Sequence, residues 1–252
     1  MASVAPLLVT ARRSEDAIVA DLDDAALIDA LGEGRVVILK GAFPSDEMIV
    51  LRDAAMRWAR EEPEFPDGRS PDETPTLNYH RFDDGTHPSA FPHIFHQYGL
   101  NALDDLPAYF RDPAATVTAV LTDLQNRVAQ TSWDVSPQGL RTKILHYPRG
   151  GGFLTKHVHQ LEPQRVGLIL SLSRVGVDAS GGTTFETPAG TVDTSAYHDI
   201  GDVAMFRYDL QHAVEAVDPG VPLDWDADTG KWSVVLELRE NFRRSRPTNP
   251  TE

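Results

Sequence analysis

Residues 145–159 form the segment that decides the fold, and they read Leu145-His146-Tyr147-Pro148-Arg149-Gly150-Gly151-Gly152-Phe153-Leu154-Thr155-Lys156-His157-Val158-His159. A turn rich in Pro and Gly joins two runs of β-type composition, which predicts two strands connected by this turn. His157 and His159 are two residues apart in the second run, so both imidazoles are expected on the same face of the strand. This spacing suits metal chelation, although two histidines in a strand are more often an exposed or hydrogen-bonded pair.

Further runs of β-type residues surround this segment. They are short, are separated by Gly, Pro and Asp, and cover residues 141–147, 153–159, 166–174, 183–187, 203–208, 212–217 and 232–238. Short strands at this spacing predict an antiparallel sandwich or jelly roll. In such a fold the strand that begins at Gly201 can run beside the histidine strand, and it would bring His212 to the same site.

The N-terminal half alternates helix and strand signals. Helices are predicted over 24–30 and 45–60, with a strand between them over 35–40. A third helix is predicted to begin at Asp112, with Pro113 in its first position, because apolar residues recur at helical spacing after it. We therefore expect one domain over 1–252, with a mainly helical N-terminal part over 1–138, a jelly-roll core over 139–242 and a frayed tail over 243–252.

Composition excludes several classes of partner and site. The 252 residues include 38 Asp and Glu against 23 Lys and Arg, and the formal net charge of −15 disfavours binding to nucleic acid or to anionic membranes. No apolar run is long enough for a membrane span or typical of a signal peptide, so a cytoplasmic protein is expected. The chain has no cysteine and nine histidines, so any metal must be held by His, Asp or Glu.

The order of these motifs resembles that of the iron(II)/2-oxoglutarate-dependent oxygenase superfamily. In that family a Tyr-Pro-x-Gly turn leads to a strand ending in His-x-Asp, followed by Gly-Gly-x-Thr-x-Phe and a distal histidine. The corresponding residues here are Tyr147, His157, the segment 181–185 and His212. The resemblance implies an α+β protein with a double-stranded β-helix (jelly-roll) core and a mainly helical N-terminal part packed on it.

The resemblance also implies an activity and its co-substrates. A member of the family uses Fe(II), 2-oxoglutarate and O2, and it releases succinate and CO2 while it oxidises an unactivated C–H bond. Two histidines and one carboxylate normally occupy one face of the iron. The sequence departs from this pattern because His159 stands where the family has the carboxylate. We expect His159 to be the third ligand, with Glu162 or a water as the alternative; the family's halogenases offer a further analogy, but their small residue at this position is unlike His159.

The family binds the far carboxylate of 2-oxoglutarate with an Arg or Lys on a late strand. Lys231 and Ser233 lie on one face of the last predicted strand and fit this role. Arg239 is the substitute cation on the same face, and Tyr147 and Lys143 are further candidates. The alternate residues of this strand, which are Trp232, Val234, Leu236 and Leu238, are expected to form core against the helices.

Residues 62–103 have little periodicity and predict a long functional loop. Its part between Tyr79 and Tyr98 is rich in His and aromatic residues and is expected to act as a lid over the mouth of the jelly roll. The candidate substrate contacts in it are Asn78, His80, Arg81, His93 and His96. The resemblance makes an amino acid or a small natural-product intermediate a plausible substrate.

Two other functions compete with the oxygenase. A cupin-type metalloenzyme would use three histidines, with Glu162 as a further ligand, and would consume no oxoacid. The gap from His159 to Glu162 is one residue shorter than the cupin pattern, and the Gly-Gly-Thr-Thr-Phe segment favours the oxygenase. A metal-free ligand-binding jelly roll would leave His157 and His212 without a common purpose.

Overall fold

A computed structural model describes residues 3–61, 76–83, 92–100, 103–136 and 139–238, and for residues 76–83 it describes the backbone alone. The N-terminal part contains β1 (Leu7–Ser14), β2 (Ala17–Ala20), α1 (Asp24–Gly32), β3 (Val37–Lys40), α2 (Ser45–Glu61), β4 (Thr76–Asp83), β5 (His93–Leu100), a short 3-10 helix (Leu103–Asp105) and α3 (Ala108–Ala129). The C-terminal part contains β6 (Leu140–Pro148), β7 (Gly152–His157), β8 (Val166–Ser171), β9 (Thr183–Thr187), β10 (Gly190–Asp193), β11 (Val203–Arg207), β12 (His212–Val217) and β13 (Gly230–Leu238).

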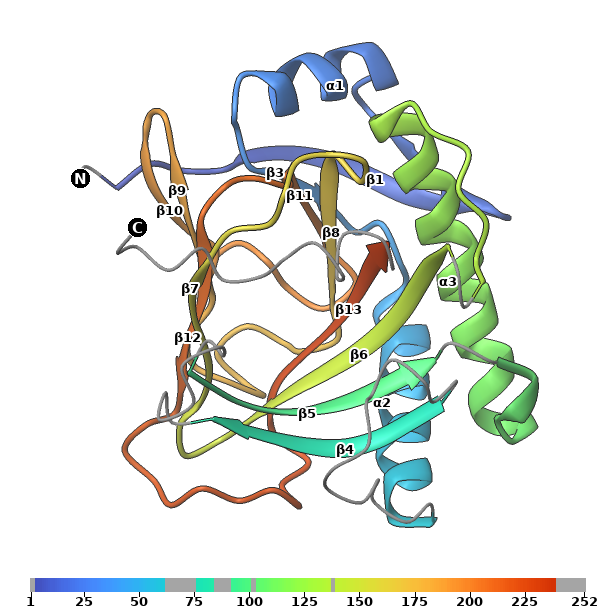
Figure 1. The fold of residues 1–252 in the computed structure, drawn as a ribbon, viewed down its shortest axis with the longest axis vertical. Helices are drawn as coiled ribbons and strands as arrows, with labels where there is room; N and C mark the ends of the chain where they lie inside the picture. Colours follow the sequence, from blue (N-terminus) through green and yellow to red (C-terminus); the bar gives the residue numbers. More distant parts are fainter. Residues whose placement is uncertain (1–2, 62–75, 84–91, 101–102, 137–138, 239–252) are drawn as a thin grey trace.

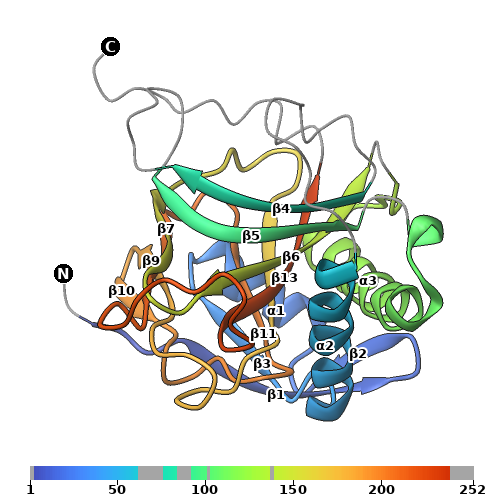
Figure 2. The same ribbon diagram turned by 90° about the horizontal axis from the view of Figure 1, so that it is seen from below.

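The eight C-terminal strands form a double-stranded β-helix, so the predicted jelly roll is confirmed. The chain crosses between two groups of four strands, ordered β6-β13-β8-β11 in the larger sheet and β7-β12-β9-β10 in the smaller sheet, except at the β9–β10 hairpin (Figure 1). Strand β5 pairs with both β6 and β7 and joins the two sheets (Figure 2). Strands β3, β1 and β2 extend the larger sheet beyond β11.

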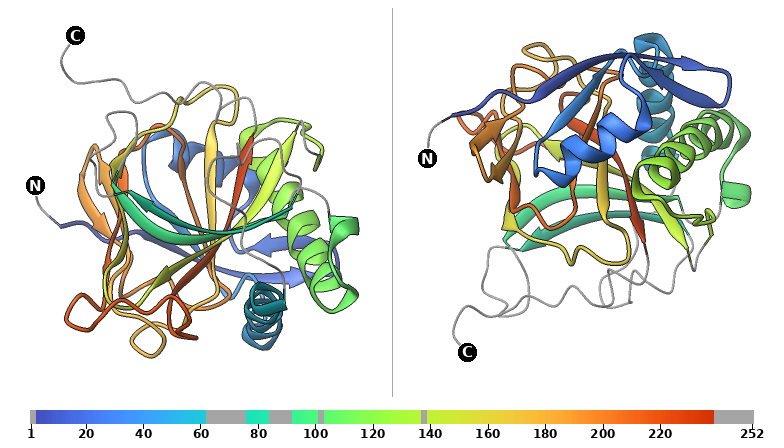
Figure 3. Two further views of the ribbon diagram at one scale, coloured as in Figure 1. Left: turned by 60° about the horizontal axis from the view of Figure 1, so that its bottom comes forward. Right: turned by 90° about the horizontal axis from the view of Figure 1, so that it is seen from above.

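The helices cover the outer face of the larger sheet (Figure 3). As predicted, the side chains of Trp232, Val234, Leu236 and Leu238 on β13 are buried in a core that they share with α2 and α3. Since side chains alternate along a strand, Lys231, Ser233, Val235 and Glu237 face the interior of the barrel. The alternation of β13 therefore separates the residues that stabilise the fold from those that face the site.

The turn between β6 and β7 directs the histidine strand. Gly150 has φ +87°, and a Cβ at this position would lie 2.3 Å from the carbonyl oxygen of Pro222. The backbone conformation and the close approach of the loop before β13 both require glycine. Both β6 and β7 pair antiparallel with β5, so this turn passes the chain from the larger sheet to the smaller sheet and leads β7 on to His157.

Two N-terminal predictions are confirmed and one is corrected. Helix α1 is capped by the Asp23 side chain, which accepts a hydrogen bond from the Ala26 amide at 2.8 Å, and α2 begins at Ser45 as expected. The third helix, however, begins at Ala108 rather than at Asp112, so Pro113 lies inside it. The extra turn buries Phe110 against Trp58, and this packing outweighs the backbone hydrogen bond that Pro113 cannot donate.

The prediction of one long loop over 62–103 is wrong for two segments. Strands β4 and β5 form a regular antiparallel hairpin in which Thr76 pairs with Leu100 and Asp83 with His93. The polar side chains of His93, His96 and Gln97 are buried in β5. Because these residues are polar, the hydropathy pattern did not indicate a strand here. Of the tail, residues 243–252 lie outside the described residues.

None of the helices in the described ranges combines the length and apolar character that a membrane span requires.

Candidate metal centre and co-substrate pocket

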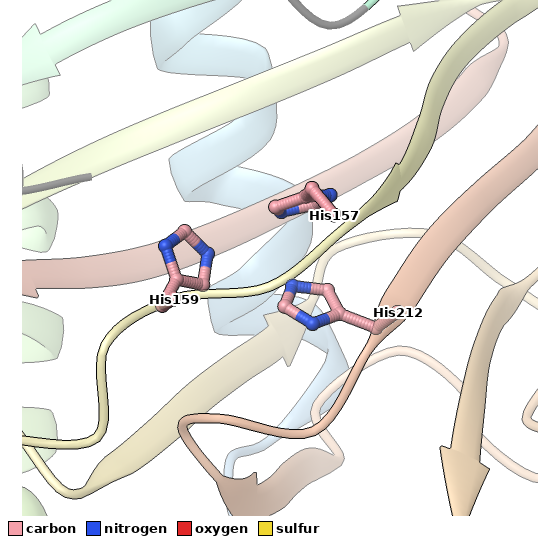
Figure 4. A group of neighbouring side chains, drawn as sticks. All are labelled: His157, His159 and His212. Atoms are coloured by element: carbon pink, nitrogen blue, oxygen red, sulfur yellow. The ribbon is translucent and has the colours of Figure 1, made fainter. Parts of the chain in front are cut away.

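Three histidine side chains meet at one end of the barrel (Figure 4). His157 is the last residue of β7, and His212, the first residue of β12, pairs directly with it. His159 follows two residues after β7 and turns its ring toward the same point. Each ring offers one nitrogen atom as a ligand, and these three nitrogen atoms all lie within 4.8 Å of one another. The structure therefore brings together the three residues that the sequence indicated as metal ligands.

Two of the three rings are oriented by the backbone. The Nδ1 atom of His157 lies 2.9 Å from the carbonyl oxygen of Thr155, and that of His212 lies 2.8 Å from the carbonyl oxygen of Leu210. A carbonyl oxygen can only accept, so Nδ1 carries the proton in both rings and Nε2 keeps its lone pair. Metal-bound histidines are usually oriented by such a bond from the other ring nitrogen.

Burial keeps the cluster uncharged. Burial, together with the nearby His157, lowers the pKa of His159 to about 4. Burial also lowers the pKa of His157, and it holds the pKa of His212 well below its usual value, with help from both neighbours. Neutral imidazoles are the form that binds a metal ion.

The donor set fits a divalent transition metal. Imidazole is a suitable ligand for Fe, Zn, Cu and Ni. With metal–nitrogen bonds of about 2.1 Å, adjacent ligand atoms lie about 3 Å apart, so the ring nitrogens have to move inward by about 1 Å or slightly more at the widest pair. Small rotations of the side chains can supply this movement.

Glu162 does not join the cluster. Its side chain is 61% exposed and accepts two hydrogen bonds from Arg165, at 3.0 and 3.1 Å. The alternative in which Glu162 completes the ligand set is therefore not supported, because its carboxylate points to solvent and to Arg165. His159, and not Glu162, lies beside His157 and His212.

A second set of polar groups lies on the inner face of the barrel around the start of β13. Lys231 is 6% exposed, and its Nζ has no hydrogen bond or ion pair among the described residues. The Oγ atoms of Ser233 and Thr183 are buried and also have no partner in the described ranges. Lys231 lines a cavity together with Ser171, Ser173, Thr194 and His198.

Burial of an unpaired amine has a large effect on its ionisation. It lowers the pKa of Lys231 from 10.5 to about 8, and only the charge of Asp193 acts in the opposite direction. A buried ammonium group without a counter-ion is costly, and it is typical of a site that binds an anion. The sequence had indicated both Lys231 and Ser233 from their shared face of the strand.

Lys143 has a different partner from the one expected. It forms an ion pair with Glu237, which lies on the inner face of β13 and also accepts a contact from Arg141 at 3.5 Å. Burial opposes ionisation of Glu237, but the charge and hydrogen bond of Lys143 outweigh it and lower its pKa. The negative charge of Glu237 partly opposes the lowering of the pKa values of His157 and His159 by burial, so this carboxylate lies near enough to the histidines to act on their charge.

Two functional candidates were missed in the sequence. Glu237 shares the inward face of β13 with Lys231 and Ser233, and this alternation could have identified it. Tyr208, which directly follows β11, stacks on His159, and no spacing rule pointed to it. Tyr147 is buried beside Phe95 on the inner face, as a co-substrate contact requires, whereas Arg239 lies outside the described residues.

The candidate substrate contacts separate into three groups. His93 is buried and packs against Phe95 with tilted rings, and Phe95 in turn contacts Tyr147, which faces the interior. His96 lies on the opposite face of the sheet, where it stacks on Tyr98 beneath α2, so the structure does not bring it to the histidine cluster. Asn78, His80 and Arg81 belong to β4, and their side chains lie outside the described residues.

Comparison with known proteins supports the fold. The sequence matches no family model and no curated protein. A prolyl-4-hydroxylase from Pseudomonas putida matches 86% of this chain and 98% of its own, with a TM-score of 0.55 and 14% identity. A prolyl hydroxylase from Trichoplax adhaerens, solved with a hypoxia inducible factor peptide fragment, matches 88% and 92%, with a TM-score of 0.55 and 11% identity.

An oxidoreductase of the 2OG-Fe(II) oxygenase family from Burkholderia pseudomallei is also similar. It matches 92% of this chain and 94% of its own, with a TM-score of 0.52 and 15% identity. These likenesses extend over nearly the whole chain at low identity. The chain therefore has the jelly-roll fold of the iron(II)/2-oxoglutarate oxygenases, and its resemblance to that superfamily is confirmed at the level of the fold.

Proposed function

We propose that the protein is an iron(II)- and 2-oxoglutarate-dependent oxygenase that oxidises a C–H bond of a small polar molecule and releases succinate and CO2. The observation that carries this proposal is the combination of two features inside one barrel. Three neutral histidines converge at one end, and a buried ammonium group without a partner in the described residues lies on the inner face at Lys231. A metal and a dicarboxylate together satisfy both features.

In this proposal each residue has a defined task. His157 and His212 bind the metal through Nε2, because their Nδ1 atoms already donate to backbone carbonyls. His159 is the third ligand in place of the carboxylate. The ammonium group of Lys231 and the hydroxyl of Ser233 bind the far carboxylate of 2-oxoglutarate. The bound iron supplies the redox chemistry that couples O2 to the decarboxylation of 2-oxoglutarate and the oxidation of the substrate.

A buried apolar cluster includes Tyr147, the strand partner of Lys231. Phe95, Tyr147, Val214 and Val217 form a buried cluster with Leu154 packed against it. Burial of these side chains excludes water from the groups beside them and strengthens their electrostatic interactions. Tyr147 has a hydroxyl that can orient the co-substrate, since it lies opposite Lys231 in the strand pairing of β6 and β13.

The cupin-type alternative accounts for fewer of these observations. A three-histidine enzyme that consumes no oxoacid has no use for the buried amine of Lys231 or the unsatisfied hydroxyl of Ser233. It also loses Glu162 as a ligand, because this side chain pairs with Arg165 at the surface. A metal-free jelly roll does not explain why the rings of His157 and His212 are held by backbone carbonyls and converge with His159.

The substrate class rests on fewer residues. Among the candidate substrate contacts whose side chains the structure describes, His93 on β5 faces the interior of the barrel, because side chains alternate along the strand. We propose a small polar substrate, such as an amino acid or a natural-product intermediate, that reaches the metal from the histidine end of the barrel. The buried ion pair of Lys143 and Glu237 at this end supplies polar groups for such a molecule.

The direct test is the conversion of 2-oxoglutarate to succinate. The protein with Fe(II), O2 and 2-oxoglutarate should form succinate, detected by proton NMR, and omission of either Fe(II) or O2 should stop it. His212→Ala should abolish the conversion, whereas His146→Gln, which changes a buried histidine on the outer face, should retain it. Iron binding without any succinate, in the presence of a broad panel of small polar molecules, would count against the proposal.

A further inference from the structure

The imidazole of His159 is oriented in a different way from the other two. His157 and His212 each donate Nδ1–H to a carbonyl oxygen of their own strand region. His159 lies beyond the end of β7, and its ring nitrogens have no hydrogen-bond partner in the part of the chain that the structure describes. A ligand without such a bond needs another restraint on the plane of its ring.

Tyr208 supplies a flat surface against this ring. The ring centroids of His159 and Tyr208 are 4.4 Å apart, and the two planes differ by 7°. Near-parallel aromatic rings at this separation attract each other beyond their simple burial. The contact restrains the plane of the imidazole, and the two ring nitrogens lie in this plane.

Tyr208 is itself held firmly. It is 4% exposed and belongs to a buried cluster with Ile38, Phe185 and Phe206. Its backbone amide donates a hydrogen bond to the carbonyl oxygen of Arg165 at 2.8 Å. The surface on which His159 rests is therefore part of the rigid core of the barrel.

The stack also sets the relation of His159 to the other histidines. The rings of His157 and His159 are perpendicular, with centroids 4.9 Å apart, and those of His159 and His212 are 5.3 Å apart. A ring that was free to rotate about its side-chain bonds would present its nitrogens to this point only part of the time. Tyr208 removes this freedom before the metal binds.

We propose that Tyr208 is the positioning residue of the third metal ligand, and that stacking on it replaces the hydrogen bond that orients the other two. This inference rests on the proposed function, since it requires a metal at the three histidines. It explains how a histidine can serve at a position where the family that the sequence resembles uses a carboxylate. It assigns Tyr208 no contact with the metal or with the co-substrate.

The test is an anaerobic titration with Co2+, whose visible absorption reports the number of its ligands. Tyr208→Phe keeps the stacked ring and should change the Kd for Co2+ by less than about two-fold. Tyr208→Leu removes the ring and should weaken binding about ten-fold, the lower end of the range for the loss of a group that orients a ligand. Its Co2+ spectrum should match that of His159→Ala.

A double-variant cycle makes the test specific. Tyr208→Leu combined with His159→Ala should bind Co2+ no more weakly than His159→Ala alone, because Tyr208 acts through His159. Near-ultraviolet circular dichroism checks the fold of each variant, and Tyr208→Met serves in place of a Leu variant that does not fold. Unchanged affinity in both apolar variants, or fully additive losses, would overturn the inference. A wild-type protein that binds neither Co2+ nor Fe(II) would overturn the proposed function with it.

Discussion

Replacement of Lys231 by Met is expected to weaken the binding of 2-oxoglutarate and, at the same time, to stabilise the ligand-free protein. Met keeps the unbranched apolar stem and removes the ammonium group. A lysine with a structural role would have an acidic partner, and its loss would destabilise the fold. Lys231 has no such partner among the described residues. Its replacement should therefore raise the stability of the ligand-free protein, whereas replacement of a lysine with a structural role should lower it.

The size of the stabilisation follows from the pKa. Burial lowers the pKa of Lys231 from 10.5 to about 8. At about 1.4 kcal/mol for each pKa unit, this difference corresponds to an upper limit of about 3 kcal/mol at pH 7. The unfolded chain binds the proton more tightly, so the stability of the wild type should rise between pH 8 and pH 10.5, and the variant should lack this rise.

The loss of binding follows from the ionic hydrogen bonds. A hydrogen bond to a charged group contributes about 1.5–3 kcal/mol, which corresponds to a ten-fold to hundred-fold increase in the Kd for 2-oxoglutarate. Calorimetric titration measures the Kd, and urea unfolding without ligand measures the stability. Lys156→Met is the matched control, because Lys156 is half-exposed and pairs with Glu186 at the surface. A variant that is less stable than the wild type, or that binds 2-oxoglutarate equally well, would refute the assignment.

Three further predictions concern the metal, the pH dependence and the buried ion pair. His212→Ala should reduce bound iron, measured by elemental analysis after anaerobic loading, to a small fraction of the wild-type content, and equal iron in both proteins would exclude His212 as a ligand. The Kd for 2-oxoglutarate should rise about ten-fold from pH 7 to pH 9, because the pKa of Lys231 is about 8 and only its charged form binds the carboxylate; a flat profile would argue against this role. Glu237→Gln removes the carboxylate on which Lys143 and Arg141 converge and should lower the free energy of unfolding by about 3 kcal/mol, whereas Lys143→Met combined with Glu237→Met should recover much of this loss. No loss of stability in the single variant would show that the pair is not coupled to the fold.

The barrel could be predicted from the sequence because its strands follow simple local rules. Alternating side chains and turn residues identified the strands around His157 and His212, and the same alternation placed Lys231 and Ser233 on one face and Trp232 on the other. These features depend on neighbours along the chain. Strand β10 was missed because it has only four residues.

The errors arose where tertiary packing outweighs local signals. Strand β5 buries His93, His96 and Gln97, and polar residues of this kind predict a loop when their partners are unknown. Helix α3 begins before Pro113 because Phe110 packs against Trp58, which is distant in the sequence. Tyr208 meets His159 only through the folding of the barrel, so no spacing along the chain could reveal this contact, whereas the alternation of β13 could have indicated Glu237.

The visible absorption of the protein with Fe(II) and 2-oxoglutarate under anaerobic conditions reports directly whether the keto acid binds iron at the three histidines. Chelation of the iron by the keto acid at the three histidines should produce a metal-to-ligand charge-transfer band that neither component gives alone. The band should disappear in His212→Ala and should require more 2-oxoglutarate in Lys231→Met. A protein that binds Fe(II) at these histidines but develops no band at saturating 2-oxoglutarate would contradict the proposed function.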